Sequence, residues 1–172
     1  SDVYKRQMPL DELPPYCVVG KDENGGYRVI KTALVTEALE AEGTTVKVNK
    51  SHLFAIGDFV TVGGDLKGAS DKITAIDKSN DGYDVITLEA KIGAAKVGQV
   101  LVGVKEKSTA GKATLVTSSS ELVITLSKVD LTVANQSCGL MVRGTISEGN
   151  MPFPIDAGLK ALMSLILSLI HI

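Results

Sequence analysis

Three oxygen-bearing side chains at alternate positions form the best candidate for a metal site in this sequence. Asp77, Ser79 and Asp81 are followed by Gly82, the arrangement in which calcium-binding loops present their ligands. The twelfth position of such a loop needs a bidentate glutamate, but Leu88 stands there, and both flanks alternate like strands. An ordinary hairpin turn is the favoured interpretation, and weak calcium binding is the alternative.

Side chains suited to catalysis are scarce. Of the two histidines, His171 lies in a terminal segment of doubtful origin, so His52 alone would have to serve a triad or a metal site. We expect His52 to be a solvated or hydrogen-bonded loop side chain. Gly111 and Lys112 resemble the end of a phosphate-binding loop, but Ala113 replaces the hydroxyl residue that this loop requires. The sequence therefore predicts a protein that is not an enzyme and needs no cofactor.

Composition narrows the classes of partner. The formal net charge is −2, and Lys and Arg are dispersed among acidic residues, which argues against a nucleic-acid surface. The 17 glycines and the 4% aromatic content suit tight turns and short strands better than an aromatic-lined cleft. Cys17 and Cys138 cannot define a disulfide framework and are interpreted as small, half-buried residues. The apolar tail at 157–172 is too short and too interrupted for a membrane span.

Residues 43–104 contain one pattern twice: a strand, a small loop, a glycine followed by a polar residue, and a second strand. The first copy runs through 46–48 and 54–62, and the second through 86–88 and 95–102 with one extra loop residue. In both copies apolar residues fall two apart, the period of a strand with one buried face. We predict a small β-module made of two related hairpins, which serves as a scaffold.

Three flanking segments complete the predicted module. Residues 16–20 and 27–30 enclose an Asn-Gly pair and predict a hairpin. Residues 72–77 and 83–88 enclose an Asn-Asp-Gly turn and predict the clearest hairpin in the chain, which joins the two copies. Residues 32–42 fit either a short helix or a strand, and we favour the strand because the neighbouring elements are strands.

The C-terminal part combines a connector, strands and one helix. Residues 105–120 are rich in Ser, Thr, Lys, Gly and Ala and predict a flexible connector. Strand-like segments follow at 121–126, 129–133 and 139–146. Asp156 fits a helix N-cap, and a short helix with one apolar face follows it. The expected fold class is mainly β, a small β-barrel or β-clip-like module of paired hairpins with one short C-terminal helix. The apolar face of that helix comprises Leu159, Leu162, Met163 and Ile166.

The two ends of the chain differ in style from the rest. Residues 1–7 and 167–172 resemble translated sequencing-adapter sequence of the kind found on metagenomic gene fragments, so we set them apart from the fold. Residues 8–15 are acidic and punctuated by proline, which predicts an extended arm. The expected organisation is the arm, a β-hairpin module at 16–104, the connector, and strands plus a helix at 121–166 on the same domain.

Residues 125–130, 140–148 and 151–155 carry a family resemblance. The three segments read Thr-Leu-Ser-Lys-Val-Asp, Leu-Met-Val-Arg-Gly-Thr-Ile-Ser-Glu and Met-Pro-Phe-Pro-Ile. Together they resemble the closing segment of head decoration and head-fibre proteins of tailed bacteriophages, in which a Val-x-Gly strand leads to a proline step and a helix. The Gly-Asp-x-Val turn at 57–60 is similar to the β-rich part of gut-phage head-fibre proteins. Met151 replaces the usual aromatic residue before the proline, and Phe153 follows two residues later.

The resemblance implies a non-enzymatic virion protein that forms a homotrimer and binds the major capsid protein on the outer surface of the head. It also implies synthesis in the cytoplasm of the bacterial host, with no nucleic-acid or membrane partner. The arm would dock by adding a strand to a capsid edge, and the helix would pack either on its own sheet or across the trimer axis. The residues expected at capsid or subunit contacts are Pro14, Pro15, Arg143, Met151, Phe153, Leu159, Leu162 and Met163.

A carbohydrate-binding adhesin or tail-associated module is the main alternative, with a glycan of the host surface as its ligand. Small β-modules with polar loops also serve this function, and exposed aromatic rings stack on sugar faces. An enzyme is the least favoured class, because the sequence indicates no pocket. The aromatic residues that could stack on a sugar are Tyr4, Tyr16, Tyr27, Phe54, Phe59, Tyr83 and Phe153.

Overall fold

The computed structural model describes residues 12–13, 18–21, 27–64, 68–111, 115, 122–125, 129–130, 140–141, 144–147, 152–154 and 167–170. Within these residues every regular element is a strand, which confirms the predicted mainly β fold class. The strands are β1 (Glu12–Leu13), β2 (Val18–Lys21), β3 (Tyr27–Val29), β4 (Thr32–Leu34), β5 (Thr45–Val48), β6 (Phe59–Val62), β7 (Ser70–Asp77), β8 (Asp84–Leu88), β9 (Val100–Val104), β10 (Leu122–Thr125), β11 (Val129–Asp130), β12 (Leu140–Met141), β13 (Gly144–Ser147) and β14 (Leu167–Ile170).

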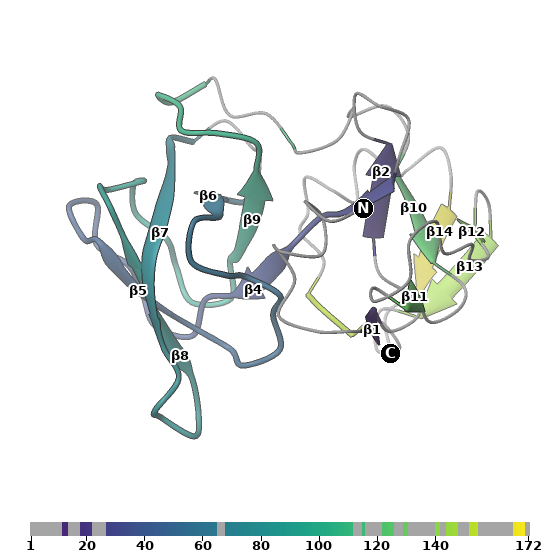
Figure 1. The fold of residues 1–172 in the computed structure, drawn as a ribbon, viewed down its shortest axis with the longest axis horizontal. Coiled ribbons are helices and arrows are strands. Elements are labelled where there is room, and N and C mark those ends of the chain that lie inside the picture. The colour runs from purple at the N-terminus through teal and green to yellow at the C-terminus, as the bar shows by residue number, and fades with distance from the viewer. Residues whose placement is uncertain are drawn as a thin grey trace.

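A closed barrel forms one half of the molecule, on the left in Figure 1. Its six strands are antiparallel and follow the order β4-β9-β6-β7-β8-β5. The two end strands of this order also meet, because Val35, directly after β4, forms an antiparallel bridge with Val48 of β5. The Asn49 amide adds a hydrogen bond of 2.9 Å to the Leu34 carbonyl. Each strand therefore has a neighbour on both sides, and closure removes the exposed edges of the sheet.

The core lies inside the barrel and follows the alternation of the strands. On β8, side chains alternate between buried and half-buried, as expected for a strand with one face toward a core. All residues of β9 are buried, so this strand is covered on both of its faces. Phe54, from the loop between β5 and β6, is the largest fully buried side chain. The core comprises Ala33, Val35, Leu39, Val46, Val48, Phe54, Val60, Ile73, Ile86, Leu88, Ile92, Ala95 and Leu101.

The doubled pattern corresponds to two structural units, and strands of one unit pair with strands of the other in the barrel. The first unit contains β4, β5 and β6, and the second contains β7, β8 and β9. Strand β5 pairs with β8 in a register that aligns Val46 with Ile86, and β6 pairs with β9 in a register that aligns Thr61 with Val102. The prediction that each copy is a hairpin is wrong, because the two strands of one copy are not neighbours in the barrel. Equivalent strands of the two units pair with each other instead.

The equivalence of the two units extends beyond the repeated sequence pattern, because β4 and β7 each pair with their neighbours in the same way. The Val35–Val48 bridge of the first unit corresponds to the Ile73–Leu88 pair of the second. Leu34 of β4 pairs with Val100 of β9. The equivalent residue of β7, Lys72, pairs with Phe59 of β6, which corresponds to Val100. Exchanging the two units therefore reproduces the strand order and the registers. The barrel has a local two-fold pseudosymmetry.

The loops that precede β6 and β9 are also equivalent. In the first unit, the Ala55 amide donates to Asp58 Oδ2 at 2.9 Å, and the Asp58 amide donates to the Ala55 carbonyl at 3.1 Å. In the second unit, the Lys96 amide donates to Gln99 Oε1 at 2.7 Å, and the Gln99 amide donates to the Lys96 carbonyl at 3.1 Å. The polar residue after each glycine of the repeated pattern therefore closes its turn with its own side chain.

The other described strands belong to smaller sheets. A four-stranded antiparallel sheet has the order β12-β10-β2-β3, and its β2–β3 pair confirms the hairpin predicted around the first Asn-Gly pair. Strand β1, within the predicted arm, pairs with β11. Strand β13 pairs in parallel with β14, which consists of residues that the sequence analysis had set apart from the fold. This pairing does not bear on the origin of those residues, and the adapter interpretation stays a prediction.

Several predicted elements can be placed against the described strands. The hairpin between 72–77 and 83–88 is confirmed as β7 and β8. The strand favoured at the start of 32–42 is confirmed as β4, and beyond it Leu39 forms a bridge with Ala95. Strands β10, β11 and β12 fall within the three C-terminal segments predicted as strands, and β13 overlaps the third segment and ends one residue beyond it. The predicted helix after Asp156 lies outside the described residues. Of the segment just before it, the structure describes residues 152–154.

The two loop glycines provide a test of the pseudosymmetry. Gly57 and Gly98 have φ angles of 97° and 91°, and a Cβ atom at either position would meet no atom within 4 Å. Strain of the backbone is therefore the whole cost, and we expect Gly57→Ala and Gly98→Ala each to lower the free energy of unfolding by about 1–2 kcal/mol. Gly82→Ala, in a turn whose φ is not left-handed, is the control and should cost less. Urea unfolding followed by circular dichroism measures the three values. A loss in the Gly82→Ala control as large as the other two, or clearly different losses at Gly57 and Gly98, would contradict the assignment.

Candidate functional site

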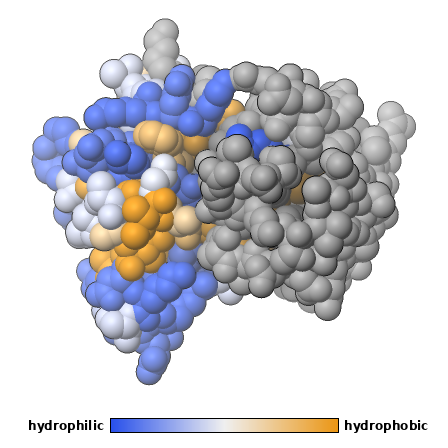
Figure 2. Space-filling model, viewed as in Figure 1, coloured by the Kyte–Doolittle hydropathy of each residue, from blue (hydrophilic) through white to orange (hydrophobic). Residues whose placement is uncertain are grey.

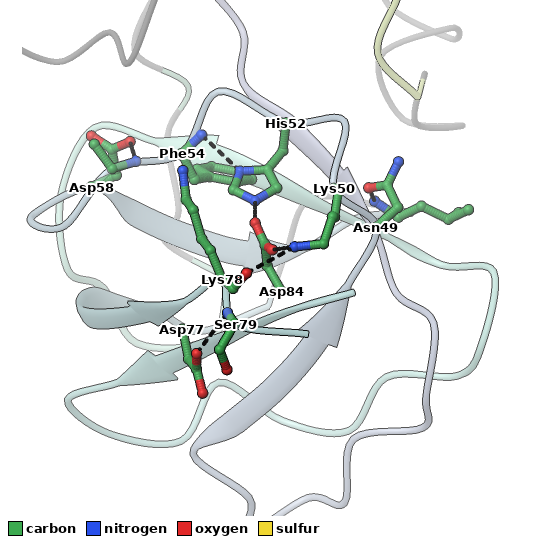
Figure 3. Close-up of polar contacts among 11 residues, drawn as sticks. Asn49, Lys50, His52, Phe54, Asp58, Asp77, Lys78, Ser79 and Asp84 are labelled. Atoms are coloured by element: carbon green, nitrogen blue, oxygen red, sulfur yellow. Dashed lines mark hydrogen bonds and ion pairs between the residues drawn. The ribbon is translucent and has the colours of Figure 1, made fainter. Parts of the chain in front are cut away.

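His52 occupies a buried position in the loop between β5 and β6. Its Nε2 lies 2.8 Å from Asp84 Oδ2, and the Phe54 amide donates to its Nδ1 at 3.1 Å (Figure 3). The side chains of His52 and Asp84 are only 1% and 3% exposed. We expected a solvated or hydrogen-bonded loop histidine, and the structure shows a hydrogen-bonded one whose ring is buried.

The hydrogen bonds determine the tautomer of His52. A backbone N–H can only donate, so Nδ1 must carry a lone pair, and the proton of the neutral ring resides on Nε2, where it is donated to Asp84. Burial lowers the pKa of His52 below its ordinary value, although the hydrogen bond with Asp84 opposes this shift. The nearby ammonium groups of Lys78 and Lys50 lower the pKa further. His52 is therefore a neutral donor to Asp84.

Asp84 begins β8 and receives a second donor. Lys50 Nζ lies 2.8 Å from Asp84 Oδ1 and also donates to the Lys78 carbonyl at 3.1 Å. Burial alone would raise the pKa of Asp84, but the hydrogen bonds from Lys50 and His52 outweigh it, and the pKa lies below its ordinary value. The carboxylate thus stays ionised and ties the loop after β5 to the β7–β8 hairpin.

The chemistry available to this cluster is structural. A catalytic histidine needs a nitrogen that can exchange a proton with a substrate, but both nitrogens of His52 are bonded within the protein and the ring is buried. The cluster of His52, Asp84, Lys50 and the Phe54 amide is therefore best described as an anchor for a loop.

A second buried ion pair lies on the same loop. Lys31 Nζ contacts Asp58 Oδ2 at 2.7 Å, and their side chains are 9% and 12% exposed. The same oxygen accepts the Ala55 amide at 2.9 Å, so Asp58 joins the turn to the residue that precedes β4. Burial lowers the pKa of the Lys31 ammonium, and the attraction of Asp58 opposes this shift.

A third polar cluster holds the segment after β9 against β7. Ser70 Oγ donates to the Glu106 carbonyl at 2.8 Å and lies 2.8 Å from Ser108 Oγ. The backbones of Ser70 and Ser108 also form an antiparallel bridge. The neighbouring Asp71, whose side chain is buried, contacts Lys107 Nζ at 3.3 Å. The start of the predicted flexible connector is therefore fixed to the barrel.

The calcium candidate has the geometry of a turn. The Ser79 amide donates to Asp77 Oδ1 at 2.9 Å, and the Gly82 amide donates to Asn80 Oδ1 at 2.8 Å. The hydrogen bonds from Ser79 lower the pKa of Asp77. Both amides are thus satisfied by Asx-type bonds, as in an ordinary turn. In the part of the chain that the structure describes, no group of three or more His, Cys, Asp or Glu side chains is placed to hold a metal ion. Calcium binding through Asp77, Ser79 and Asp81 stays a prediction.

One residue of the predicted contact set falls within the described residues. Phe153 is half-buried, and the carbonyl of the adjacent Pro154 accepts a hydrogen bond from the Thr32 hydroxyl of β4. This segment therefore lies against the barrel. The other residues of that set lie outside the described residues; they are Pro14, Pro15, Arg143, Met151, Leu159, Leu162 and Met163.

Two exposed apolar residues occupy equivalent positions in the two units. Ile56 precedes Gly57 and is 67% exposed, and Val97 precedes Gly98 and is 64% exposed. Figure 2 shows a face of the barrel that is largely hydrophilic and is crossed by a strip of hydrophobic surface. Isolated exposed apolar side chains are common on protein surfaces, so their equivalence is more informative than their exposure.

Sequence reasoning did not find the pairs that anchor the loops. Lys31 and Asp58 are 27 residues apart, and His52 and Asp84 are 32 apart. Neither pair has a local spacing that predicts contact. The available signal was the alignment of the two copies. It shows that the charged Asp58 occupies the position that the neutral Gln99 has in the second copy.

Comparisons with known proteins add no relative: no family model, curated protein or solved structure matches this chain. Among the residues that the structure describes, there is no helix with the length and apolar character needed to cross a membrane.

The buried Lys31–Asp58 pair leads to a prediction about stability. Asp58→Ala removes the carboxylate that pairs with the buried Lys31 ammonium and that accepts the Ala55 amide, so we expect a loss of about 3 kcal/mol in the free energy of unfolding. Glu42→Ala is the matched control, because it breaks the Lys91–Glu42 pair, whose side chains are 56% and 78% exposed, and should change stability little. Similar losses in both variants, measured by urea unfolding, would refute the assigned role of the buried pair.

Proposed function

We propose that this chain is a non-enzymatic structural protein of a tailed-bacteriophage head, which binds the outer surface of the capsid as a homotrimer. The proposal rests first on the resemblance of residues 125–130, 140–148 and 151–155 to the closing segment of head decoration and head-fibre proteins. Its partner would be the major capsid protein, and it would be made in the host cytoplasm and function on the virion.

The use of buried polar groups supports the non-enzymatic part of the proposal. In the described part of the chain, every buried polar or charged side chain bonds another segment of the chain or an adjacent amide, as a scaffold requires. Enzymes instead direct perturbed buried groups into a cleft where a substrate can reach them. The buried polar and charged residues are Lys31, Thr32, His52, Thr61, Ser70, Asp71 and Asp84.

The segment around Phe153 is the contact surface that the described residues support best. It lies against β4 through the Pro154 carbonyl, so the barrel holds it in place. A half-buried phenylalanine still presents part of its ring, and aromatic residues contribute strongly to protein interfaces. The arm is a weaker candidate, because Glu12 and Leu13 already pair with β11.

The adhesin alternative receives less support from the aromatic residues. Phe54 is buried in the core and cannot stack on a sugar. Lys47 Nζ lies 4.9 Å from the centre of the Tyr83 ring and covers one of its faces. Of the rings that a carbohydrate site could use, Phe54 is therefore inaccessible, and one face of Tyr83 is already covered.

Capsid binding provides the test. We expect the full chain to cosediment with heads of a tailed phage whose genome carries this gene, and light scattering to give three times the mass of one chain. Phe153→Ala should weaken cosedimentation at least about tenfold, because aromatic residues are frequent hot spots. Ile56→Ala removes an exposed apolar side chain from the barrel and should leave binding unchanged. A monomer that fails to bind these heads would overturn the proposal.

A further inference from the structure

The two equivalent loops of the barrel differ at one buried position. The Asn49 amide donates to the Leu34 carbonyl at 2.9 Å, and the Glu89 amide donates to the Lys72 carbonyl at the same distance, which aligns the starts of the two loops. Counting three residues onward places His52 opposite Ile92. Both side chains are buried, at 8% and 4% exposure. The first unit therefore has a buried imidazole at a position where the second unit has a buried alkyl group.

The acceptor of this histidine differs between the units as well. Asp84 pairs with Val48 at the end of β5, and the equivalent partner of Leu88 is Thr44, whose carbonyl accepts the Leu88 amide at 2.7 Å. The second unit thus has Thr44 where the first has Asp84. Asp84 is buried, whereas Thr44 is exposed. Since the second unit forms the same loop with Ile92 and an exposed threonine at these positions, the loop does not require a buried ionisable pair. Burying such a pair costs desolvation energy that a buried alkyl group avoids.

We propose that His52 is an acid-sensitive latch, which holds residues 49–58 on the barrel while its ring is neutral and releases them when the ring is protonated. The added proton must go to Nδ1, because Nε2 already carries one. Nδ1 then becomes a donor and faces the Phe54 amide, which is also a donor. The hydrogen bond between them is lost, and two buried donors are left opposed.

The charged groups around the ring strengthen this response. Asp84 at the start of β8 favours the protonated ring, but it already accepts a hydrogen bond from Lys50. Lys50 on the same loop and Lys78 in the β7–β8 turn carry positive charges that disfavour it. Burial adds to the effect of these two ammonium groups, and the neutral ring is the form that fits the closed loop.

The sign of the pH dependence follows from these contacts. The pKa of His52 is lowered in the closed loop and returns to its ordinary value, about 6.5, when the loop opens. The open loop therefore takes up a proton that the closed loop refuses, and the closed state loses stability as the pH falls below about 6.5. Above that range the latch contributes its full stabilisation.

Release would make the two equivalent loops unlike each other. The segment from 49 to 58 carries the exposed Ile56 and the Asp58 carboxylate that pairs with Lys31. The loop of the second unit, with Ile92 at the matching position, has no ionisable group there and stays closed in acid. Acid would thus move the loop that carries the exposed Ile56 and leave the loop that carries the exposed Val97 in place. This inference is independent of capsid binding.

Hydrogen exchange of single amides tests the latch in the full chain. The Phe54 amide reports on the first loop, and the Ala95 amide, which donates to the Leu39 carbonyl at 2.9 Å, reports on the second. After correction for the intrinsic effect of pH, we expect the Phe54 amide to exchange faster at pH 5 than at pH 7.5, by up to about thirtyfold, because pH 5 lies about 1.5 units below the ordinary pKa of histidine and each unit corresponds to a factor of ten. The Ala95 amide should change by less than about twofold. Equal changes at both amides, or none, would overturn the proposal.

Variants assign the effect to one ring. His52→Ile should abolish the difference between the two pH values, and the double variant His52→Ile with Asp84→Thr, which installs the pair of the second unit, should do the same if the single variant folds poorly. His171→Gln removes the other histidine and should retain the full response. Retention of the response in both His52 variants, or its loss in His171→Gln, would refute the assignment to His52. Imidazole nitrogen shifts that place the proton on Nδ1 at pH 7.5 would refute it as well.

Discussion

Pairing between equivalent strands of the two units is the constraint on which the barrel depends. Strand β5 pairs with β8 and β6 pairs with β9, and the strands of one unit lie apart in the sheet. A single unit therefore cannot enclose the core, which draws Val35 and Phe54 from the first unit and Ile73 and Ile86 from the second. The contacts that close the barrel join residues far apart in sequence, so closure is a cooperative event.

Closure leaves two loops that must be held against the barrel, and the units do this with different chemistry. The first unit uses buried ionisable groups, with Asp58 bonded to Lys31 and Asp84 bonded to His52. The second unit uses a neutral amide at Gln99 and an alkyl group at Ile92. Because a buried charge must be paired whereas an alkyl group need not be, the proposed pH response belongs to the first loop. The pseudosymmetric backbone thus carries two loops of different chemistry.

The sequence predicted the strands better than their partners. Alternating apolar residues located β5, β6, β8 and β9, because burial of one face is a local pattern. It did not predict that β5 pairs with β8, since short strands of similar period fit several partners and the choice depends on closure of the whole sheet. The burial of His52 and its bond to Asp84 were missed for the same reason: both depend on the loop folding over the barrel.

Interstrand nuclear Overhauser effects between backbone protons test the pairing between the two units most directly. The account predicts cross-peaks that connect the strand around Val46 with the strand around Ile86, and the strand around Thr61 with the strand around Val102. These are the pairs that lie nearest the local two-fold axis. Cross-peaks that instead connect β5 with β6 and β8 with β9 would show two separate hairpins, and would contradict both the pseudosymmetric barrel and the comparison of its two loops.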